Sequence, residues 1–125
     1  MKAVSASSFT YNANVAGEFV FYLWDSVEGY SKAGHYSGNG VADGTFVYTG
    51  FKPAFLLAKE KSQSGEGWIM LDNKRSPSNA VVKQLFANLT QAEESVTTKA
   101  VDFLSNGFKV RNTDGVLNDG EKYIY

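Results

Sequence analysis

Nucleophilic catalysis in this sequence would have to use a single histidine, His35, because the chain contains no cysteine. A Ser–His–Asp site needs the imidazole beside a hydroxyl and a third group that orients the ring. His35 lies between Gly34 and Tyr36 in a glycine-rich stretch, and the sequence lacks the Gly-x-Ser-x-Gly elbow of serine hydrolases. This context favours a surface or structural histidine over a catalytic one.

Paired carboxylates are the other route to catalysis, since glycoside hydrolases place two of them around the bond they cleave. The acidic residues at expected strand ends or in loops include Asp25, Glu28, Asp43, Asp72, Asp102 and Asp114. Charged residues occupy such places by default, so the sequence selects no pair. A hydrolase is the least favoured alternative, and we predict that the protein is not an enzyme and has no catalytic residues.

Two loops have some of the features of a ligand site. Gly38–Asn39–Gly40 is glycine-rich, but it lacks the Lys-Ser/Thr ending of a phosphate loop and a strand is expected after it. Asp114–Gly120 is rich in oxygen ligands, but it lacks the spacing and terminal glutamate of a calcium loop. Turn residues explain both stretches, so we predict no cofactor and no metal.

Aromatic side chains are the remaining candidates, because sugar-binding sites stack exposed rings beside amide and carboxylate groups. Tyr30 and Tyr36 lie among glycines in a loop that is expected to be exposed, and Trp68 follows a polar loop. Aromatic rings also hold small β-sandwiches together, so core packing is the alternative for each of them. The predicted ligand-binding residues are Tyr30, Tyr36 and Trp68, with a glycan as the ligand.

The amino-acid composition of the chain limits the classes of partner that it is expected to bind. The chain has 125 residues, enough for one domain, and its 12 basic and 13 acidic residues give a net charge of -1. This balance argues against nucleic-acid binding through bulk positive charge. No apolar stretch follows Lys2, and the longest apolar run, Phe19–Trp24, is far shorter than a bilayer span. We therefore expect no nucleic-acid partner, no signal peptide and no membrane insertion.

Short apolar runs alternate with clusters of Gly, Asn, Asp and Ser, which is typical of all-β proteins. The expected strands are Glu18–Trp24, Lys32–Ser37, Thr45–Thr49, Pro53–Glu60, Trp68–Leu71, Ser95–Phe103, Phe108–Arg111 and Lys122–Tyr125. The fourth and fifth runs should form an antiparallel hairpin, and Asn106–Gly107 is a strong hairpin-turn signal. The predicted fold is an antiparallel, jelly-roll-like β-sandwich of about eight short strands.

One short helix is expected at Ala80–Leu89, because its apolar residues share one helical face. We expect Arg75 to pair with Asp72 and so to fix the long polar loop around them. Gly50 should form a corner between the sheets. Phe103 and Phe108 flank the Asn106–Gly107 turn and should close the core there.

The two ends of the sequence are alike. Asn14, Gly17 and Phe19–Val20–Phe21 echo Asn118, Gly120 and Tyr123–Ile124–Tyr125, with one residue of slip. Any two turn–strand units could share this pattern, or the chain could be one period of a tandem array. We predict a single β-sandwich module over residues 1–125 and leave the tandem alternative open.

Longer stretches that together cover most of the chain carry a resemblance to a known family. They are Trp24–Lys32, Gly38–Phe55, Trp68, Asp72, Lys74–Pro77, Asn79, Val101–Arg111 and Tyr123–Tyr125. These stretches resemble a repeated β-sandwich module of tail fibres and related virion structural proteins of phages, particularly marine ones. The family is largely uncharacterised, and the resemblance brings no catalytic residues with it. This chain departs from the family at its amino end, since Met1 precedes the first repeat-like strand by only a few residues.

The resemblance implies a β-sandwich displayed on a virus particle. The expected function is non-enzymatic, in particle assembly and host-surface adhesion, with the virion as its location. The expected partners are other virion proteins, further copies of the chain in a homo-oligomer, and a host-surface glycan or receptor. The alternatives are a carbohydrate-binding module or a capsid decoration protein.

Overall fold

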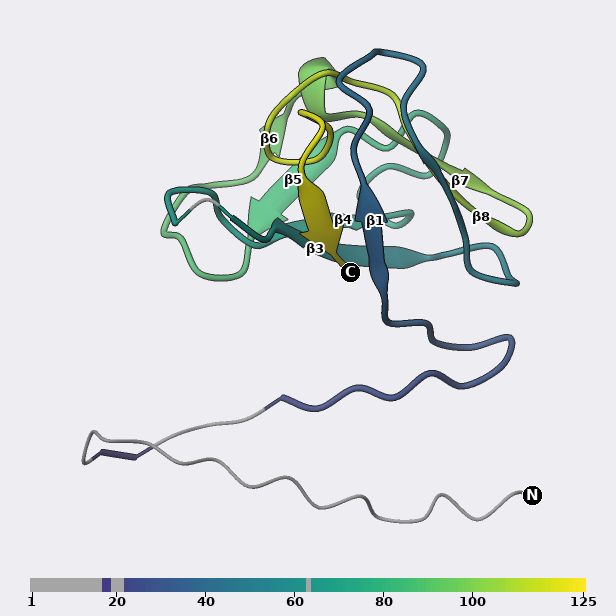
Figure 1. Cartoon of the computed structure of the whole chain (residues 1–125), viewed down its shortest axis with the longest axis horizontal. Helices are drawn as coiled ribbons and strands as arrows, with labels where there is room; N and C mark the ends of the chain where they lie inside the picture. Colours follow the sequence, from purple (N-terminus) through teal and green to yellow (C-terminus); the bar gives the residue numbers. More distant parts are fainter. Residues whose placement is uncertain (1–16, 19–21, 63) are drawn as a thin grey trace.

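The computed structural model describes residues 17–18, 22–62 and 64–125, and every structural statement below refers to them (Figure 1). This part of the chain contains nine strands and a single 3-10 turn. They are β1 (His35–Ser37), β2 (Phe46–Tyr48), β3 (Phe55–Glu60), β4 (Ile69–Asp72), β5 (Lys83–Phe86), β6 (Glu94–Ser95), η1 (Thr97–Lys99), β7 (Val101–Leu104), β8 (Gly107–Val110) and β9 (Lys122–Ile124). The all-β prediction is confirmed.

The strands form two antiparallel sheets. One has six strands in the order β1-β9-β3-β4-β5-β6, and the other has three in the order β2-β8-β7. The predicted hairpin is β3–β4, in which Leu56 lies opposite Leu71 and Ala58 opposite Ile69. The predicted turn at Asn106–Gly107 joins β7 to β8. The sandwich-like arrangement predicted from the sequence is therefore confirmed.

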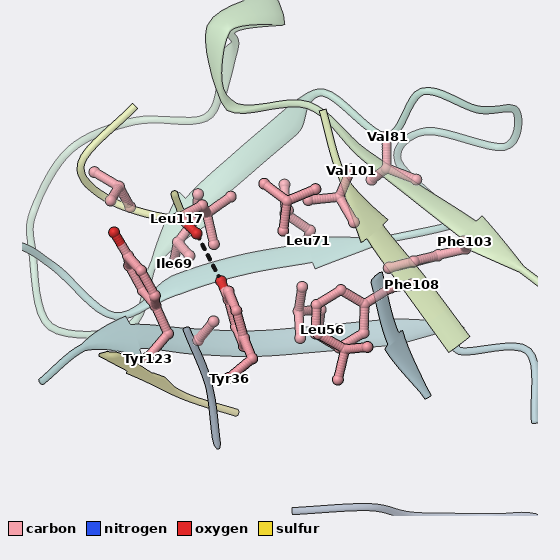
Figure 2. Close-up of a cluster of buried hydrophobic side chains, with 14 of the residues drawn as sticks. Tyr36, Leu56, Ile69, Leu71, Val81, Val101, Phe103, Phe108, Leu117 and Tyr123 are labelled. Carbon is pink, nitrogen blue, oxygen red and sulfur yellow. Dashed lines mark hydrogen bonds between the residues drawn. The ribbon is translucent and has the colours of Figure 1, made fainter. Parts of the chain in front are cut away.

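Alternation of side chains along the strands places the core between the sheets. In β3, Leu56 and Ala58 are buried while Phe55 is exposed, as expected when successive residues point to opposite faces. Phe103 and Phe108 lie opposite each other on β7 and β8, and both are buried. Figure 2 shows side chains of both sheets meeting in this cluster. The predicted role of the two phenylalanines in closing the core is confirmed.

Two glycines are required by the backbone around β2. Gly50 has a φ of 87°, a left-handed conformation that favours glycine, and it turns the chain between β2 and β3 as predicted. Gly107 has no room for a side chain, because a Cβ there would lie 2.1 Å from the carbonyl oxygen of Val47. Gly50 therefore allows the corner between β2 and β3, and Gly107 allows β2 and β8 to approach each other closely.

Asn118 ties together two loops that are far apart in the sequence. Its buried side chain donates from Nδ2 to the carbonyl oxygens of Asn112 at 2.6 Å and Val41 at 2.8 Å, and to Asn39 Oδ1 at 3.0 Å. Its Oδ1 accepts from the backbone N–H of Asn39 at 2.8 Å. The loop before β2 and the loop before β9 are therefore held by one side chain.

Several expected boundaries change. The helix predicted at Ala80–Leu89 is wrong: this stretch contains β5, which pairs with β4 and buries Gln84 and Phe86 on alternate positions. Residues 95–103, expected as one strand, are divided into the end of β6, η1 and β7. Of the strand expected at Lys32–Ser37, only His35–Ser37 is a strand in the structure, and it is β1. In the strand predicted at Glu18–Trp24, Phe19–Phe21 lies outside the described residues, and residues 22–24 have no strand structure.

No helix in the described part of the chain is long and apolar enough to cross a membrane.

Candidate functional site

A large apolar groove lies between the sheets and the segment that leads into β1. We call residues 22–34 the strap; in Figure 1 it is the purple-to-blue ribbon that ends at β1. The groove has a volume of about 510 Å³. Its aromatic and aliphatic walls include Trp24, Tyr30, Phe51, Phe55, Leu57 and Trp68. A cavity of this size, lined mostly by apolar side chains, is typical of a binding site.

A tight turn shapes the strap. Val27 N donates to Ser31 O at 2.9 Å, and Ser31 N donates to Val27 O at 2.9 Å. Ser31 Oγ also donates to the carbonyl oxygen of Asp25 at 2.6 Å. Gly29 makes the turn possible with a φ of 75°. As a result Trp24, which precedes the turn, and Tyr30, which lies within it, both line the groove.

Trp68 enters the groove from the start of β4. Its backbone N–H donates to Asn88 Oδ1 at 2.8 Å, and its carbonyl oxygen accepts from Ala87 N at 2.9 Å. These bonds fix the main chain, while the indole ring is half-buried in the groove wall. The structure therefore brings two of the three predicted ligand-binding residues, Tyr30 and Trp68, to one groove.

Tyr36, the third predicted residue, lies elsewhere. The expectation that it is exposed is wrong: its side chain is only 5% exposed, and its hydroxyl donates to the carbonyl oxygen of Leu117 at 2.9 Å (Figure 2). The neighbouring glycines suggested a loop, but β1 pairs with β9 and turns Tyr36 into the core. Burial, and then the neighbouring Tyr123 hydroxyl, raise the pKa of Tyr36. Tyr36 is a core residue.

Two walls of the groove are not among the three predicted ligand-binding residues. Trp24 ends the strand expected at Glu18–Trp24, yet it belongs to no strand and 67% of it is exposed. Phe55 lies within the strand expected at Pro53–Glu60, yet 53% of it is exposed. Phe55 could have been found from alternation, because it lies on the opposite face of β3 from the buried Leu56 and Ala58.

Asp43, one of the carboxylates weighed for catalysis, lies in an ion-pair cluster away from the groove. Its Oδ1 lies 2.7 Å from Lys109 Nζ and 2.9 Å from Arg111 Nη1. Arg111 Nε also lies 2.6 Å from Asp102 Oδ2. The hydrogen bond and charge of Lys109, together with the charge of Arg111, hold the pKa of Asp43 below its ordinary value. These contacts keep the carboxyl ionised.

Asp72 and Arg75 form the predicted ion pair, with Nε and Oδ2 2.5 Å apart. Arg75 also donates from Nη2 to the carbonyl oxygen of Met70 at 3.1 Å. Burial opposes ionisation of Asp72, but hydrogen bonds from Arg75 and from the backbone of Lys74 outweigh it and lower the pKa. The predicted ion pair is confirmed, and its role in fixing the long loop stays a prediction.

The loop weighed as a calcium site uses its oxygens for its own structure. Asp114 Oδ1 accepts from Val116 N at 3.0 Å, and Asp119 Oδ1 accepts from the Tyr123 hydroxyl at 2.6 Å. Across residues 17–18, 22–62 and 64–125, no group of three or more His, Cys, Asp or Glu side chains could hold a metal ion. His35 is exposed on β1, at the edge of the six-stranded sheet.

Comparison with models of known protein families identifies the family to which this chain belongs. The model of the family described as Domain of unknown function (DUF7483) matches residues 2–125, and the chain belongs to this family. Comparison with curated proteins gave no match, and comparison with solved structures gave none either. Both the groove and the sandwich lie within the matched range.

Proposed function

We propose that this chain is a non-enzymatic structural module of a phage virion, in a tail fibre or another appendage, and that it acts in particle assembly and host-surface adhesion. The observation that carries the contact role is the groove with its exposed aromatic rim, in which Tyr30 is 82% exposed. Contiguous apolar surface of this kind marks interaction sites. The resemblance of most of the sequence to phage tail-fibre modules supports the virion as its location.

Immunogold electron microscopy tests the virion role directly. Antibodies raised against the purified chain should label an appendage of the intact source particle, and antibodies pre-absorbed with the chain should not. Label spread over the capsid would favour the alternative of a decoration protein. Unlabelled particles, with the chain found only in the free fraction of the lysate, would contradict a virion role.

A carbohydrate-binding module is the second candidate, because the groove brings Tyr30 and Trp68 beside the polar strap residues Asp25 and Ser31. A glycan array tests this function. Tyr30→Ala should lose any binding, whereas Tyr48→Ala should keep it, since Tyr48 is also exposed but does not line the groove. The absence of any signal on a broad array would count against adhesion through sugars.

A further inference from the structure

Three neighbouring strands of the six-stranded sheet bring two lysines side by side. β9, the yellow arrow beside β1 in Figure 1, lies between β1 and β3. Lys122 of β9 is paired with Ser37 of β1. On the other side of β9, Lys61 N donates to Lys122 O at 2.8 Å, so Lys61, directly after β3, lies opposite Lys122. Ser37, Lys122 and Lys61 therefore form one row across the three strands.

This row lies on the outer face of the sheet. Successive residues of a strand point to opposite faces. The chain neighbours Tyr36, Tyr123 and Glu60 are buried on the core side, whereas Lys61 and Lys122 are exposed. Residues directly opposite each other in a sheet have Cβ atoms about 4.5–5.5 Å apart. The two lysine side chains therefore leave the sheet from adjacent points on its solvent side.

The row borders a hollow with a volume of about 350 Å³, whose lining also includes Ser62 and Glu121. Ser62 Oγ donates to a carboxylate oxygen of Glu60 and lies 3.4 Å from Glu121 Oε2. The carbonyl oxygen of Ser37 accepts from the Thr45 hydroxyl at 2.7 Å, but the Ser37 hydroxyl forms no hydrogen bond within the described ranges. The hollow therefore combines two ammonium groups with one hydroxyl that is available to a ligand.

The lysine pair has no counter-charge in the described part of the chain, where neither Lys61 nor Lys122 forms an ion pair. Glu121 also lines the hollow, but its Oε2 lies beside Ser62 and not within ion-pair distance of either ammonium group. Like charges directly opposite each other on neighbouring strands destabilise a sheet. The pair therefore opposes folding, and an anion bound between the two ammonium groups would relieve the repulsion.

The donors of the hollow suit a small oxyanion. Each ammonium group offers three N–H donors, and the Ser37 hydroxyl offers one more. Hydrogen bonds from an ammonium group to an anionic oxygen are charge-assisted and stronger than neutral ones. Duplex nucleic acid, with a charge about every 1.7 Å along its axis, calls for a much larger basic surface than two lysines on a chain of net charge -1. Single anionic groups spaced along a polymer match the hollow better.

The hollow and the apolar groove share one surface of the molecule. Ile124 lies two residues from Lys122 on the same face of β9, about 7 Å along the strand, and it lines the groove. The groove also contains Tyr30 and Trp68, the two predicted sugar-binding residues that the structure brings together. A polysaccharide lying along this face would therefore meet aromatic rings and then the lysine pair.

We propose that the hollow binds a carboxylate or sulfate group of an acidic polysaccharide. Lys61 and Lys122 hold the anionic group, and the Ser37 hydroxyl donates to it. Because both lysines are exposed, the contact is screened by salt and weakens as ionic strength rises. This inference rests on the adhesion part of the proposed function and specifies the charge of the ligand.

Dextran sulfate and dextran provide the first test, because they share a sugar backbone and differ in charge. On immobilised polymers, the chain should bind dextran sulfate and the uronate polymer alginate at low salt, but not dextran. Lys61→Gln or Lys122→Gln should weaken this binding about two- to fivefold. Lys74→Gln, at another exposed lysine, is the matched control and should have no effect. Unchanged binding in the Lys61→Gln/Lys122→Gln double variant would overturn the proposal.

Lys122→Glu separates loss of binding from loss of folding. It replaces the like-charge pair with opposite charges, so the urea unfolding midpoint should rise while binding to dextran sulfate falls further than in Lys122→Gln. A lower midpoint would contradict the repulsion and overturn the proposal.

Two other outcomes would also overturn this inference. One is duplex DNA that binds as tightly as dextran sulfate, since the hollow would then select no polysaccharide. The other is a chain that binds neither acidic polymer at low salt. Immunogold label on an appendage of the particle would, in either case, leave the proposed virion function standing.

Discussion

The ring of Tyr36 on β1 stacks on the ring of Tyr123 on β9, with centroids 5.0 Å apart and planes inclined by 15°. Both rings are buried, and each hydroxyl donates to a backbone carbonyl: Tyr36 to Leu117 at 2.9 Å and Tyr123 to Gly115 at 2.7 Å. The pair joins the edge of the six-stranded sheet to the loop that precedes β9.

Removing the Tyr36 hydroxyl should destabilise the fold while preserving its shape. Tyr36→Phe leaves a buried carbonyl without its donor, which costs about 1–3 kcal/mol. Tyr36→Ala also loses the stacked ring and should cost about 3–5 kcal/mol. Urea unfolding followed by fluorescence measures both. Tyr48→Phe, at an exposed tyrosine, is the control, and an equal loss in that variant would contradict the role given to the Tyr36 hydroxyl.

The same pair should make the protein sensitive to alkali. Burial raises the pKa of both Tyr36 and Tyr123, so the unfolded chain ionises first as pH rises. Their contribution to stability is complete below pH about 10, the ordinary tyrosine value, and declines above it. The free energy of unfolding should therefore fall above that pH, and less steeply in Tyr36→Phe. An identical slope in the two proteins would contradict this explanation.

At acid pH the ion pair of Asp72 with Arg75 should be lost. Because the pKa of Asp72 is lowered in the fold, its contribution is present above pH about 4, the ordinary Asp value. It declines as pH falls toward the lower folded-state pKa, since the unfolded chain then binds the proton first. Asp72→Asn should therefore flatten the acid branch of the stability curve. Thermal unfolding at a series of pH values measures it, with Asp25→Asn, at an exposed strap residue, as control.

Gly107 should be the glycine least tolerant of substitution near the β7–β8 turn. In Gly107→Ala the new Cβ would lie 2.1 Å from the Val47 carbonyl oxygen, so β2 must shift away from β8. We expect a loss of about 1–3 kcal/mol or more. Gly65→Ala is the matched control, because no atom lies within 4 Å of its Cβ position. Comparable unfolding midpoints for the two variants would contradict the close β2–β8 approach.

The β3–β4 hairpin could be predicted because two apolar runs flank a polar loop, and this local information was sufficient. β5 could not be predicted in the same way. Val81, Leu85 and Phe86 fit one helical face, but an extended backbone also buries Val81 and Phe86, and pairing with β4 decides between the two. Local periodicity does not contain that long-range contact.

The groove was predictable only in part for a similar reason. Tyr30 and Trp68 were candidates because aromatic rings near glycines or polar loops are often exposed. Whether Phe55 is covered depends on how β3 pairs with β4 and on which face of β3 then meets the core, and that is a property of sheet register. Tyr36 was misplaced because its flanking glycines gave no sign of the pairing with β9. Register therefore limited the prediction of the site more than strand location did.

The two hydrogen bonds between Gly34 and Tyr125 have a practical consequence for protein engineering. They bring the first and last residues of the span 34–125 to adjacent positions at one edge of the sheet. A unit with neighbouring ends can be grafted into a surface loop of a carrier protein without forcing that loop apart. The span 34–125 therefore meets this geometric requirement, and Trp68, the tryptophan within it, would report on its folding in such a carrier.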